Sequence, residues 1–274
     1  MNSVSFDSLL IIGASKFTVP YLEKYFIDDK GLISERNLYY EQLPADFAGK
    51  AIAIVCDLNS IRNISTKGIV YAAALSSTAV YDASEGVNFN EETPVIENSE
   101  ILKKEKLFSE VFSAVPNIIL RLPELVIGTA MDNLGIELAQ QISKGTYMHI
   151  ENADGHCSTI HASHIPEAIL LCVNNDVTGT FNLTDGTNTP VKDLAEALSL
   201  RIGDKRIFTV RDKRARLIRI PGNILGIKGW SSKMYDFKKR NLTFSSEKLL
   251  SAINYCPTPV IDYIKTHNYD ENSL

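Results

Sequence analysis

Two long apolar runs constrain the fold of this chain more than any other feature. They read "AIAIVCDL" at 51–58 and "GIVYAAALSS" at 68–77, without alternation of apolar and polar residues. A strand with one face in water alternates, whereas a strand covered on both faces is apolar throughout, as in parallel sheets with helices on both sides. The two runs therefore predict neighbouring strands at the centre of such a sheet.

Other segments supply elements around this centre. "SLLIIG" at 8–13 ends in glycine and precedes apolar residues at helical spacing, which predicts a strand, a turn and a helix. "NIILRLPELVIG" at 117–128 predicts a strand in which pairing stops at Pro123. The segment 99–113 predicts a helix with a buried stripe of Ile101, Phe108, Val111 and Phe112.

The second half of the chain continues the pattern. We expect helices at 137–145, 165–173 and 189–203 and a strand at 179–185. In the last helix, Thr189 is the expected N-cap and Pro190 the first helical residue. Strands that alternate with helices predict an α/β fold with right-handed crossovers.

Composition limits the class of protein. The 274 residues can bury one large core or two intimate ones. No apolar run approaches the roughly 18 residues that span a bilayer, and the start "MNSVSFDSLL" lacks the basic segment of a secretory signal, so we expect a cytoplasmic protein without membrane contact. A net charge of −5 argues against nucleic-acid binding. A local basic cluster at 211–219 either holds an acidic ligand or is solvated.

The cysteines give no sign of a disulfide framework or a metal site. Cys56, Cys157, Cys172 and Cys256 are widely spaced and form no CxxC pair. We therefore expect buried free thiols and no bound metal.

Several motifs in order resemble a known family. "IIGASKFTVPYL", "LSSTAVYD", "KLFSE" and "ILRLPELVIG" are similar to the nucleotide-binding half of the extended short-chain dehydrogenase/reductases, the NAD-dependent epimerase/dehydratase family. The resemblance continues through "TIHASHIPEAILL", "GTFNLTDGTNTPVKDLAEAL" and "LTFSSEKLLSAINYCPTP" and so covers nearly the whole chain. It implies a Rossmann-like, doubly wound parallel sheet with a smaller C-terminal substrate cap. The implied Rossmann part is 1–130 with 155–187, and the implied cap is 131–154 with 188–274, together forming one compact unit.

The turn after the first strand departs from the family pattern. The family carries three glycines spaced GxxGxxG for the tight turn, the approach of the pyrophosphate and helix packing. Only Gly13 remains, with Lys16 and Val19 at the other positions. Lys16 either contacts a phosphate or obstructs its approach. The resemblance implies that NAD or NADP is held by Gly13, Ser15, Lys16 and Phe17, and by Lys106 further along the chain.

The adenosine side of the cofactor site is shortened in the sequence. Glu35 and Glu41 are both candidates for the acidic residue that binds the adenosine ribose, and each is also an ordinary surface carboxylate. Only "NSIRNISTK" at 59–67 separates the two apolar runs, too few residues for a full crossover helix. We therefore expect an abbreviated adenine side.

The family's reaction uses a hydroxyl residue, a tyrosine and a lysine four residues after the tyrosine, on one helix face. The resemblance places Ser77 at the hydroxyl position, with Thr78 beside it, and Lys106 at the lysine position. The tyrosine position is then Leu102, which has no proton to give. Lys106 is thus either a cofactor contact or a surface lysine that pairs with Glu110.

The substrate side also departs from the family. Cys157 stands where nucleotide-sugar members often carry a phosphate-binding arginine, and Ser163 and His164 replace an acidic pair. Arg121 is expected to form a structural ion pair. The substrate-facing residues that the resemblance implies are Thr78, Tyr81 and His161.

Two functions remain open at this stage. One is an atypical oxidoreductase, epimerase or dehydratase that binds NAD(P) and a small-molecule substrate and uses Ser77 and Lys106. The other is a non-catalytic descendant that acts as a nucleotide sensor, scaffold or assembly partner. The missing glycines, tyrosine and arginine favour the second, whereas retention of Ser77, Lys106 and His161 favours the first. The resemblance also implies a homodimer through the 99–113 helix.

Overall fold

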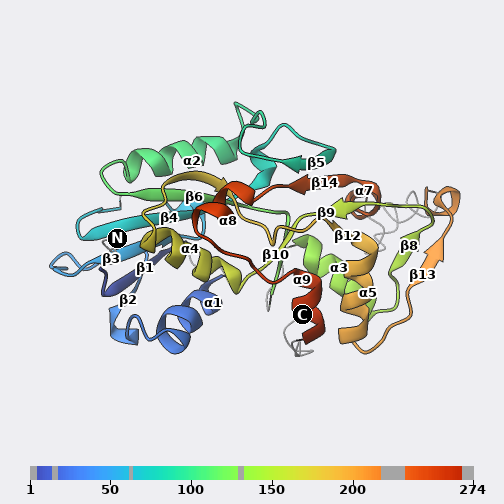
Figure 1. Ribbon diagram of the computed structural model, residues 1–274, viewed down its shortest axis with the longest axis horizontal. Coiled ribbons are helices and arrows are strands. Elements are labelled where there is room, and N and C mark those ends of the chain that lie inside the picture. Colours follow the sequence, from blue (N-terminus) through green and yellow to red (C-terminus); the bar gives the residue numbers. More distant parts are fainter. Residues whose placement is uncertain (1–4, 14–17, 62–63, 129–132, 217–231, 267–274) are drawn as a thin grey trace.

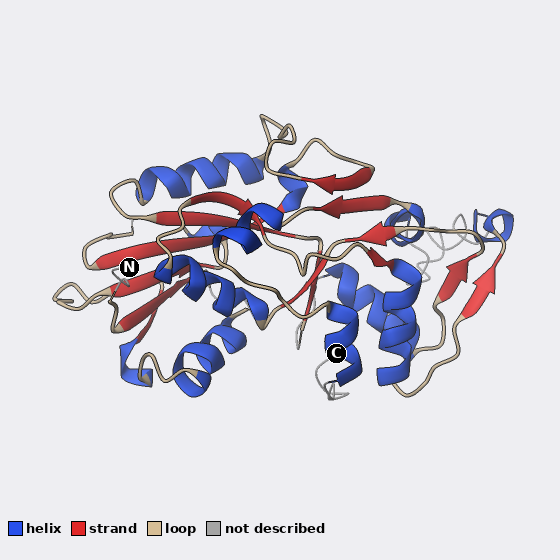
Figure 2. Ribbon diagram, viewed as in Figure 1, coloured by secondary structure: helices blue, strands red, loops and turns tan. Residues whose placement is uncertain are grey.

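The computed structural model describes residues 5–13, 18–61, 64–128, 133–216 and 232–266 (Figures 1 and 2). Its centre is a six-stranded sheet in the order β11-β6-β4-β3-β1-β2, in which every neighbouring pair is parallel. The two longest apolar runs form adjacent strands, as expected. The strands are β1 (Ser8–Ile12), β2 (Leu38–Tyr40), β3 (Ala51–Val55), β4 (Ile69–Ser77), β6 (Asn117–Leu122) and β11 (Gly179–Asn182).

Helices cover both faces of this sheet, which explains why β1 and β3 are buried at every residue. On one face, α2 (Glu100–Val111) packs Phe108 and Phe112 against Leu10 and Ile12. On the other, α1 (Val19–Glu23), a π-helical turn over Lys24–Asp29, and α4 (His164–Asn174) enclose a core that includes Leu9, Phe26 and Ile169. Figure 1 shows α2 above the strands and α1 and α4 below them. The α/β Rossmann-like architecture expected from the sequence is confirmed.

The connection from β3 to β4 is short. In its described part, the only helical element is a 3₁₀ turn over Leu58–Ser60. The neighbouring β2 has three residues and forms the edge of the sheet. This agrees with the expected abbreviation of the adenine side. The homodimer through 99–113 stays a prediction.

The chain leaves the main sheet at Pro123, as predicted. β7 (Leu125–Ile127) pairs in parallel with β10 (Thr159–His161) and not with a strand of the six-stranded sheet. A four-stranded sheet, ordered β12-β9-β14-β5, follows beside it. Its strands are β12 (Thr189–Pro190), β9 (His156–Cys157), β14 (Asn241–Phe244) and β5 (Gly86–Phe89).

The smaller part of the molecule has its own core, built from four helices. They are α3 (Asn133–Ser143), α5 (Val191–Arg201), α7 (Ser232–Lys239) and α9 (Val260–Thr266), and they contribute Leu138, Leu198, Phe237 and Val260 in that order. β8 (Met148–Ile150) and β13 (Phe208–Val210) extend it on the right of Figure 1. One late helix, α8 (Glu247–Ala252), instead sends Leu249 into the core of the main sheet. None of the described helices is long and apolar enough to cross a membrane.

The expected cap of the 189–203 helix is wrong. Helix α5 begins at Val191, with Pro190 in the cap position. Thr189 instead pairs with Cys157 between β12 and β9, and its hydroxyl lies 3.1 Å from that of Thr187 and 3.4 Å from that of Thr159. The partner strand, which is distant in the sequence, decides the conformation of Thr189.

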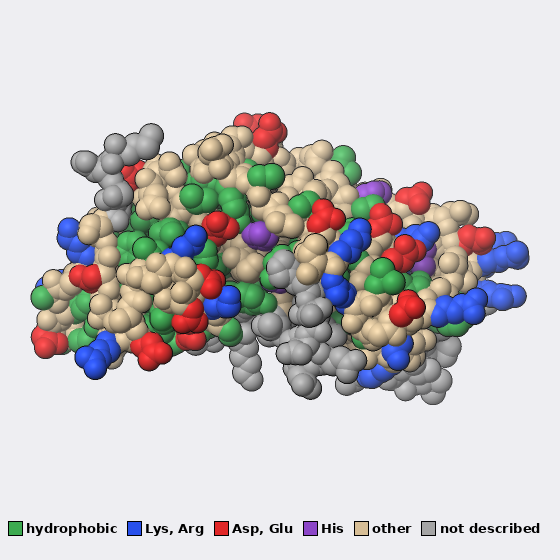
Figure 3. Space-filling view, turned by 60° about the horizontal axis from the view of Figure 1, so that its bottom comes forward, with side chains coloured by type: hydrophobic (Ala, Val, Ile, Leu, Met, Phe, Trp, Pro, Cys, Tyr) green, Lys and Arg blue, Asp and Glu red, His purple; other side chains and the backbone are tan. Residues whose placement is uncertain are grey.

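Exposed cations gather at the far end of the smaller part. Figure 3 shows Lys and Arg side chains on the right of the molecule. The exposed lysines and arginines on either side of β13 in the sequence are Lys205, Arg206, Arg211, Lys213 and Arg214. Within the predicted basic cluster, Arg216 pairs with Asp212 at 2.8 Å, and 217–219 lie outside the described residues.

Candidate functional site

A cavity of about 290 Å³ opens at the carboxyl ends of β4 and β6, where an open α/β sheet offers a ligand site. We call it the central cavity. It brings together two of the predicted substrate residues, which follow β4, with side chains from the smaller part of the molecule. Its polar or conspicuous lining residues are Thr78, Tyr81, Glu124, His156, Cys157, Ser158 and Arg240.

The turn after β4 places the predicted hydroxyl residues. Ser77 caps a 3₁₀ turn over Thr78–Val80, and its Oγ accepts the Ala79 N–H at 3.2 Å. Thr78 is buried and lines the central cavity, whereas Ser77 is half-buried and is not among the residues that line it. Of the two hydroxyls, the structure therefore brings Thr78 to the cavity.

Tyr81 lines the same cavity, but its hydroxyl is engaged elsewhere. The hydroxyl donates to Asn182 Oδ1 at 2.7 Å, and the Arg121 guanidinium lies 4.8 Å from the ring centroid. Burial raises the pKa of Tyr81 above its ordinary value, although Arg121 opposes this effect. Tyr81 therefore keeps its proton at neutral pH, unlike a tyrosine whose pKa a lysine lowers for acid/base work.

Helix α2 turns a glutamate, and not the expected lysine, toward the sheet. Glu105 is buried; its Oε2 accepts from Arg121 Nη2 at 2.7 Å and its Oε1 from Ser76 Oγ at 2.6 Å. The structural ion pair predicted for Arg121 is confirmed. Its partner was not predicted, although Glu105 shares the 105/108/112 helical spacing with Phe108 and Phe112.

The two positions that carry the family's chemistry face different surroundings. Leu102 is half-buried and packs in an apolar cluster with Val80, Tyr81 and Phe244. Lys106 is exposed. The four-residue spacing is present, but Leu102 contributes apolar contact where the family supplies a proton.

An arginine that was not predicted, Arg240, reaches the central cavity from the position between α7 and β14. Arg240 Nη2 donates to Glu124 Oε2 at 2.9 Å. The register of β14 on β9 sets Leu242 opposite Cys157, so a guanidinium lies near the position where the resemblance expected one. In the sequence, Arg240 is an arginine directly before the segment "NLTF". Its place in the cavity could not be predicted without knowing which strand pairs with that segment.

The thiols differ in their surroundings. Cys157 is buried, donates to the Thr189 carbonyl oxygen at 3.6 Å, and has a pKa raised by burial. Cys172 is buried in the main core, Cys56 is half-buried, and Cys256 is exposed. All four are free thiols, as predicted, but the expectation of burial is wrong for Cys256, which lies in the loop after α8.

Strand β1 is separated from β4 by β3 in the sheet, and Gly13 forms the turn after β1. Its φ of +70° and the Asp57 backbone, 2.8 Å from where a Cβ would stand, admit only glycine. The Gly13 N–H donates to Glu41 Oε1 at 3.0 Å. Glu41 directly follows β2, so of the two acidic candidates it is the one beside this turn, whereas Glu35 lies in a 3₁₀ turn before β2. The predicted contacts Ser15, Lys16 and Phe17 lie outside the described residues.

His161 lies away from these groups. It is buried and stacks on Tyr263 with ring centroids 3.5 Å apart. The Ser163 N–H donates to His161 Nδ1 at 3.2 Å, which places the ring proton on Nε2. His161 is not among the residues that line the central cavity, and its role at the substrate stays a prediction.

Known structures share the fold of this chain. The sequence matches no family model and no curated protein sequence. Among solved structures, the chain is similar to a human epimerase family protein with NADPH, at 11% identity over 94% of this chain and 98% of that one, with a TM-score of 0.66. It is similar to UDP-N-acetylglucosamine 4-epimerase from Bacillus cereus, at 11% identity over 97% and 98%, with a TM-score of 0.65.

A third similar structure is dTDP-glucose 4,6-dehydratase from Bacillus anthracis in complex with NAD, at 12% identity over 94% of each chain, with a TM-score of 0.63. At these identities the similarity establishes the fold alone. The chain therefore has the Rossmann-like fold of the NAD(P)-dependent epimerases and dehydratases, along almost its whole length.

The described residues fit the adenosine end of a nicotinamide dinucleotide. The Glu41 carboxylate, beside the only glycine that the turn retains, is the type of group that accepts ribose hydroxyls at this position. Asp57 faces the same glycine with its backbone and Cβ, and its carboxylate accepts from Asn59. When bound, the nicotinamide ring accepts or donates a hydride.

Proposed function

We propose that this protein binds NAD together with a small anionic molecule, and that it acts as a binding or sensing protein without the tyrosine-dependent hydride chemistry of the enzymes that share its fold. The observation that carries the proposal is the surroundings of two side chains on α2. Leu102 packs on Val80, Tyr81 and Phe244, and Lys106 is exposed. An apolar side chain in a packed cluster neither holds nor releases a proton.

Among the described residues that line the central cavity, His156 is the side chain best suited to replace the missing acid, but its Nδ1 already lies 2.8 Å from the Asp154 carbonyl oxygen and 3.1 Å from Asn241 Oδ1. Tyr81 keeps its proton and donates it to Asn182. Glu124 is engaged with Arg240. Thr78 can orient a ligand oxygen but is not an acid or base near neutral pH.

The charge of the cavity indicates the class of ligand. Arg240 is the cation among the described residues that line it, and a guanidinium binds carboxylate or phosphate oxygens through two donors. Glu124 now accepts from that guanidinium at 2.9 Å. A ligand anion therefore competes with Glu124 for Arg240, while Thr78 is available to its hydroxyl groups. The Ser158 hydroxyl is engaged by the backbone of Phe244.

An atypical oxidoreductase or isomerase is the second candidate. The observation that favours it is the retention of Ser77 at the end of β4 and of Lys106 on the neighbouring helix. Such an enzyme needs a proton donor from outside the tyrosine position.

A Leu102→Tyr variant separates the two functions. We expect the wild-type protein to bind NADH, seen as enhanced fluorescence, and to leave UDP-glucose and dTDP-glucose unconverted in the presence of NAD. Conversion is followed by chromatography of the sugar nucleotides, because an epimerase or dehydratase regenerates its NAD and leaves no net NADH. Turnover by the wild-type protein would contradict the proposal. A gain of turnover in Leu102→Tyr alone would support it, because only the acid had been missing. A Leu107→Tyr variant, changed at an exposed leucine of the same helix, is the matched control.

A further inference from the structure

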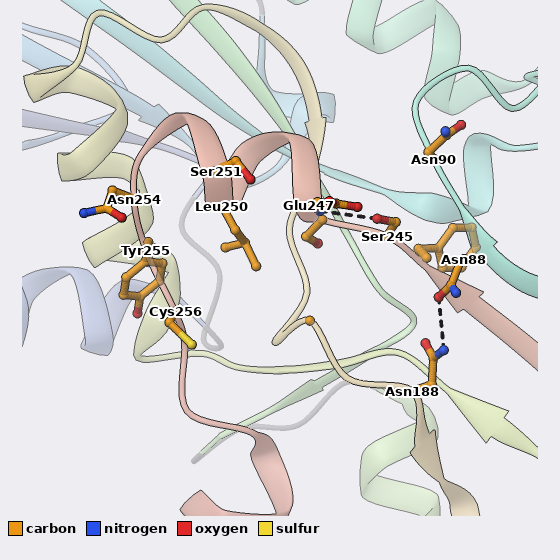
Figure 4. Close-up of a pocket in the computed structure, with 13 residues that line it drawn as sticks. Asn88, Asn90, Asn188, Ser245, Glu247, Leu250, Ser251, Asn254, Tyr255 and Cys256 are labelled. Carbon is orange, nitrogen blue, oxygen red and sulfur yellow. Dashed lines mark hydrogen bonds between the residues drawn. The ribbon is translucent and has the colours of Figure 1, made fainter.

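A second and larger cavity, of about 780 Å³, lies beyond β14 (Figure 4). Phe244, the last residue of β14, lines both this cavity and the central one. The new cavity is bordered by the loops after β5 and before β12, and by α8 with the loop that follows it. We call it the asparagine cavity, after its lining residues Asn88, Asn90, Asn188 and Asn254.

The lining is polar but almost uncharged. Beside the four amides it carries the hydroxyls of Ser245 and Ser251 and the carboxylate of Glu247. The hydroxyl of Ser246, which also lines it, is bonded to Thr184. No lysine, arginine or histidine occurs among the described residues that line it. Amides and hydroxyls both donate and accept hydrogen bonds, so this lining suits a neutral ligand with many hydroxyls and offers nothing to neutralise a phosphate or carboxylate.

The amides on one side are held in place. Asn188 Nδ2 donates to Asn88 Oδ1 at 3.0 Å, which aligns the two side chains across the cavity rim (Figure 4). The Asn88 N–H donates to Thr243 Oγ1 at 2.9 Å, and Asn88 has a φ of +57°. Asn254, on the other side, has a φ of +47°. Asparagine is one of the few residues that adopt this left-handed conformation routinely, so both positions suit it.

The same cavity offers apolar contact. Figure 4 shows Leu250, Tyr255 and Cys256 on the side opposite Asn88 and Asn188. The hydroxyl of Tyr255 is fixed by His164 Nδ1 at 2.6 Å and Glu167 Oε2 at 2.8 Å. A ring held in this way, beside Leu250, can cover the C–H face of a pyranose while the amides bind its hydroxyls.

We infer that the asparagine cavity is a binding site for a neutral saccharide, separate from the central cavity. Its volume of about 780 Å³ lies within the range for small-molecule sites, about 300–1,000 Å³. The two cavities then differ in ligand class: Arg240 gives the central one an anionic ligand, and the asparagine cavity has no cation among its described lining residues.

Calorimetric titration of the full chain tests this inference. The probes are glucose, galactose, mannose, N-acetylglucosamine and methyl glucoside, with glucose 1-phosphate as the anionic comparison. We expect saturable binding of at least one neutral probe, and we expect any binding of glucose 1-phosphate, which Arg240 of the central cavity can hold, to be unaffected by Asn188→Ala. We expect Asn188→Ala to weaken the bound probe at least about tenfold, the effect of losing two hydrogen bonds of ordinary strength.

Two controls locate the site. Asn174→Ala changes an exposed asparagine at the end of α4, and Thr78→Val changes the central cavity; we expect neither to alter saccharide affinity. The inference is overturned if no neutral probe binds at 50-fold excess over protein in the millimolar range, or if Thr78→Val and not Asn188→Ala weakens the binding of the neutral probe. None of these results bears on NAD binding, so the inference and the proposed function fail separately.

Discussion

The carboxylate of Glu105 and the guanidinium of Arg121 form a buried ion pair between α2 and β6, with Oε2 and Nη2 2.7 Å apart. A second bond of 3.0 Å joins Arg121 Nε to Oε1. Ser76 donates to the same carboxylate, and the guanidinium lies over the Tyr81 ring. The helix that carries the family's catalytic positions is thus fixed to the sheet by a structural salt bridge.

Removal of one partner of this pair should destabilise the fold strongly. Glu105→Leu leaves a buried guanidinium uncompensated, and we expect the free energy of unfolding to fall by about 3–5 kcal/mol. Arg121→Met should act in the same direction. In the double variant neither charge remains, so the loss should be smaller than the sum of the single losses. Urea denaturation measures all three, and an additive double variant would contradict this account of the pair.

Gly31 is a matched control for Gly13, the glycine of the turn after β1. Both have a positive φ, of +57° and +70° respectively, but only at Gly13 would a Cβ meet other atoms, the nearest being Asp57 Cβ at 2.7 Å. We expect Gly31→Ala to lower the free energy of unfolding by about 1–2 kcal/mol through backbone strain. Gly13→Ala should cost about 1–3 kcal/mol more through crowding. Equal effects in thermal denaturation would show that Asp57 does not confine Gly13.

Lys238 should make stability depend on pH. It is buried, donates to the Met148 carbonyl oxygen at 2.9 Å, and lies 4.4 Å from the Tyr147 ring centroid. Burial lowers its pKa from 10.5 to about 8, so between these pH values the unfolded chain binds a proton that the folded chain does not. The free energy of unfolding should therefore rise with pH across this window, by about 3 kcal/mol in total.

Chemical denaturation at pH 8, 9 and 10 measures this dependence. We expect Lys238→Met to remove the rise that is due to this lysine, and Lys213→Met, at an exposed position, to leave it unchanged. The assignment fails if wild-type protein and Lys238→Met show the same dependence on pH.

The sequence was sufficient for the parts of the fold that depend on local patterns. The apolar runs at 51–58 and 68–77 became adjacent parallel strands, and Pro123 ended β6. The short segment between β3 and β4 carries only a 3₁₀ turn in its described part, as its length required. These features follow from periodicity, chain length and backbone chemistry, which can be read without knowledge of tertiary neighbours.

Features that depend on partners distant in the sequence were missed. Glu105 appeared as one of several charges in "LKKEKL", and its burial depends on Arg121 in another strand. Arg240 reaches the central cavity only because β14 pairs with β9. Thr189 lost its expected cap role to the β12–β9 pairing. In each case a tertiary contact overrode or supplied what the local pattern left undetermined.

The proposed function requires the nucleotide end of this fold to bind NAD although the tyrosine is absent. Calorimetric titration of the wild-type chain with NAD, alongside NADPH and a Glu41→Ala variant, decides whether it does. We expect NAD to bind the wild-type chain with a Kd below about 100 μM and to raise its melting temperature at saturation. We expect NADPH to bind the wild-type chain, and NAD to bind the Glu41→Ala variant, markedly more weakly, because Glu41 follows β2 beside Gly13. The absence of heat or thermal stabilisation up to millimolar NAD would contradict the claim.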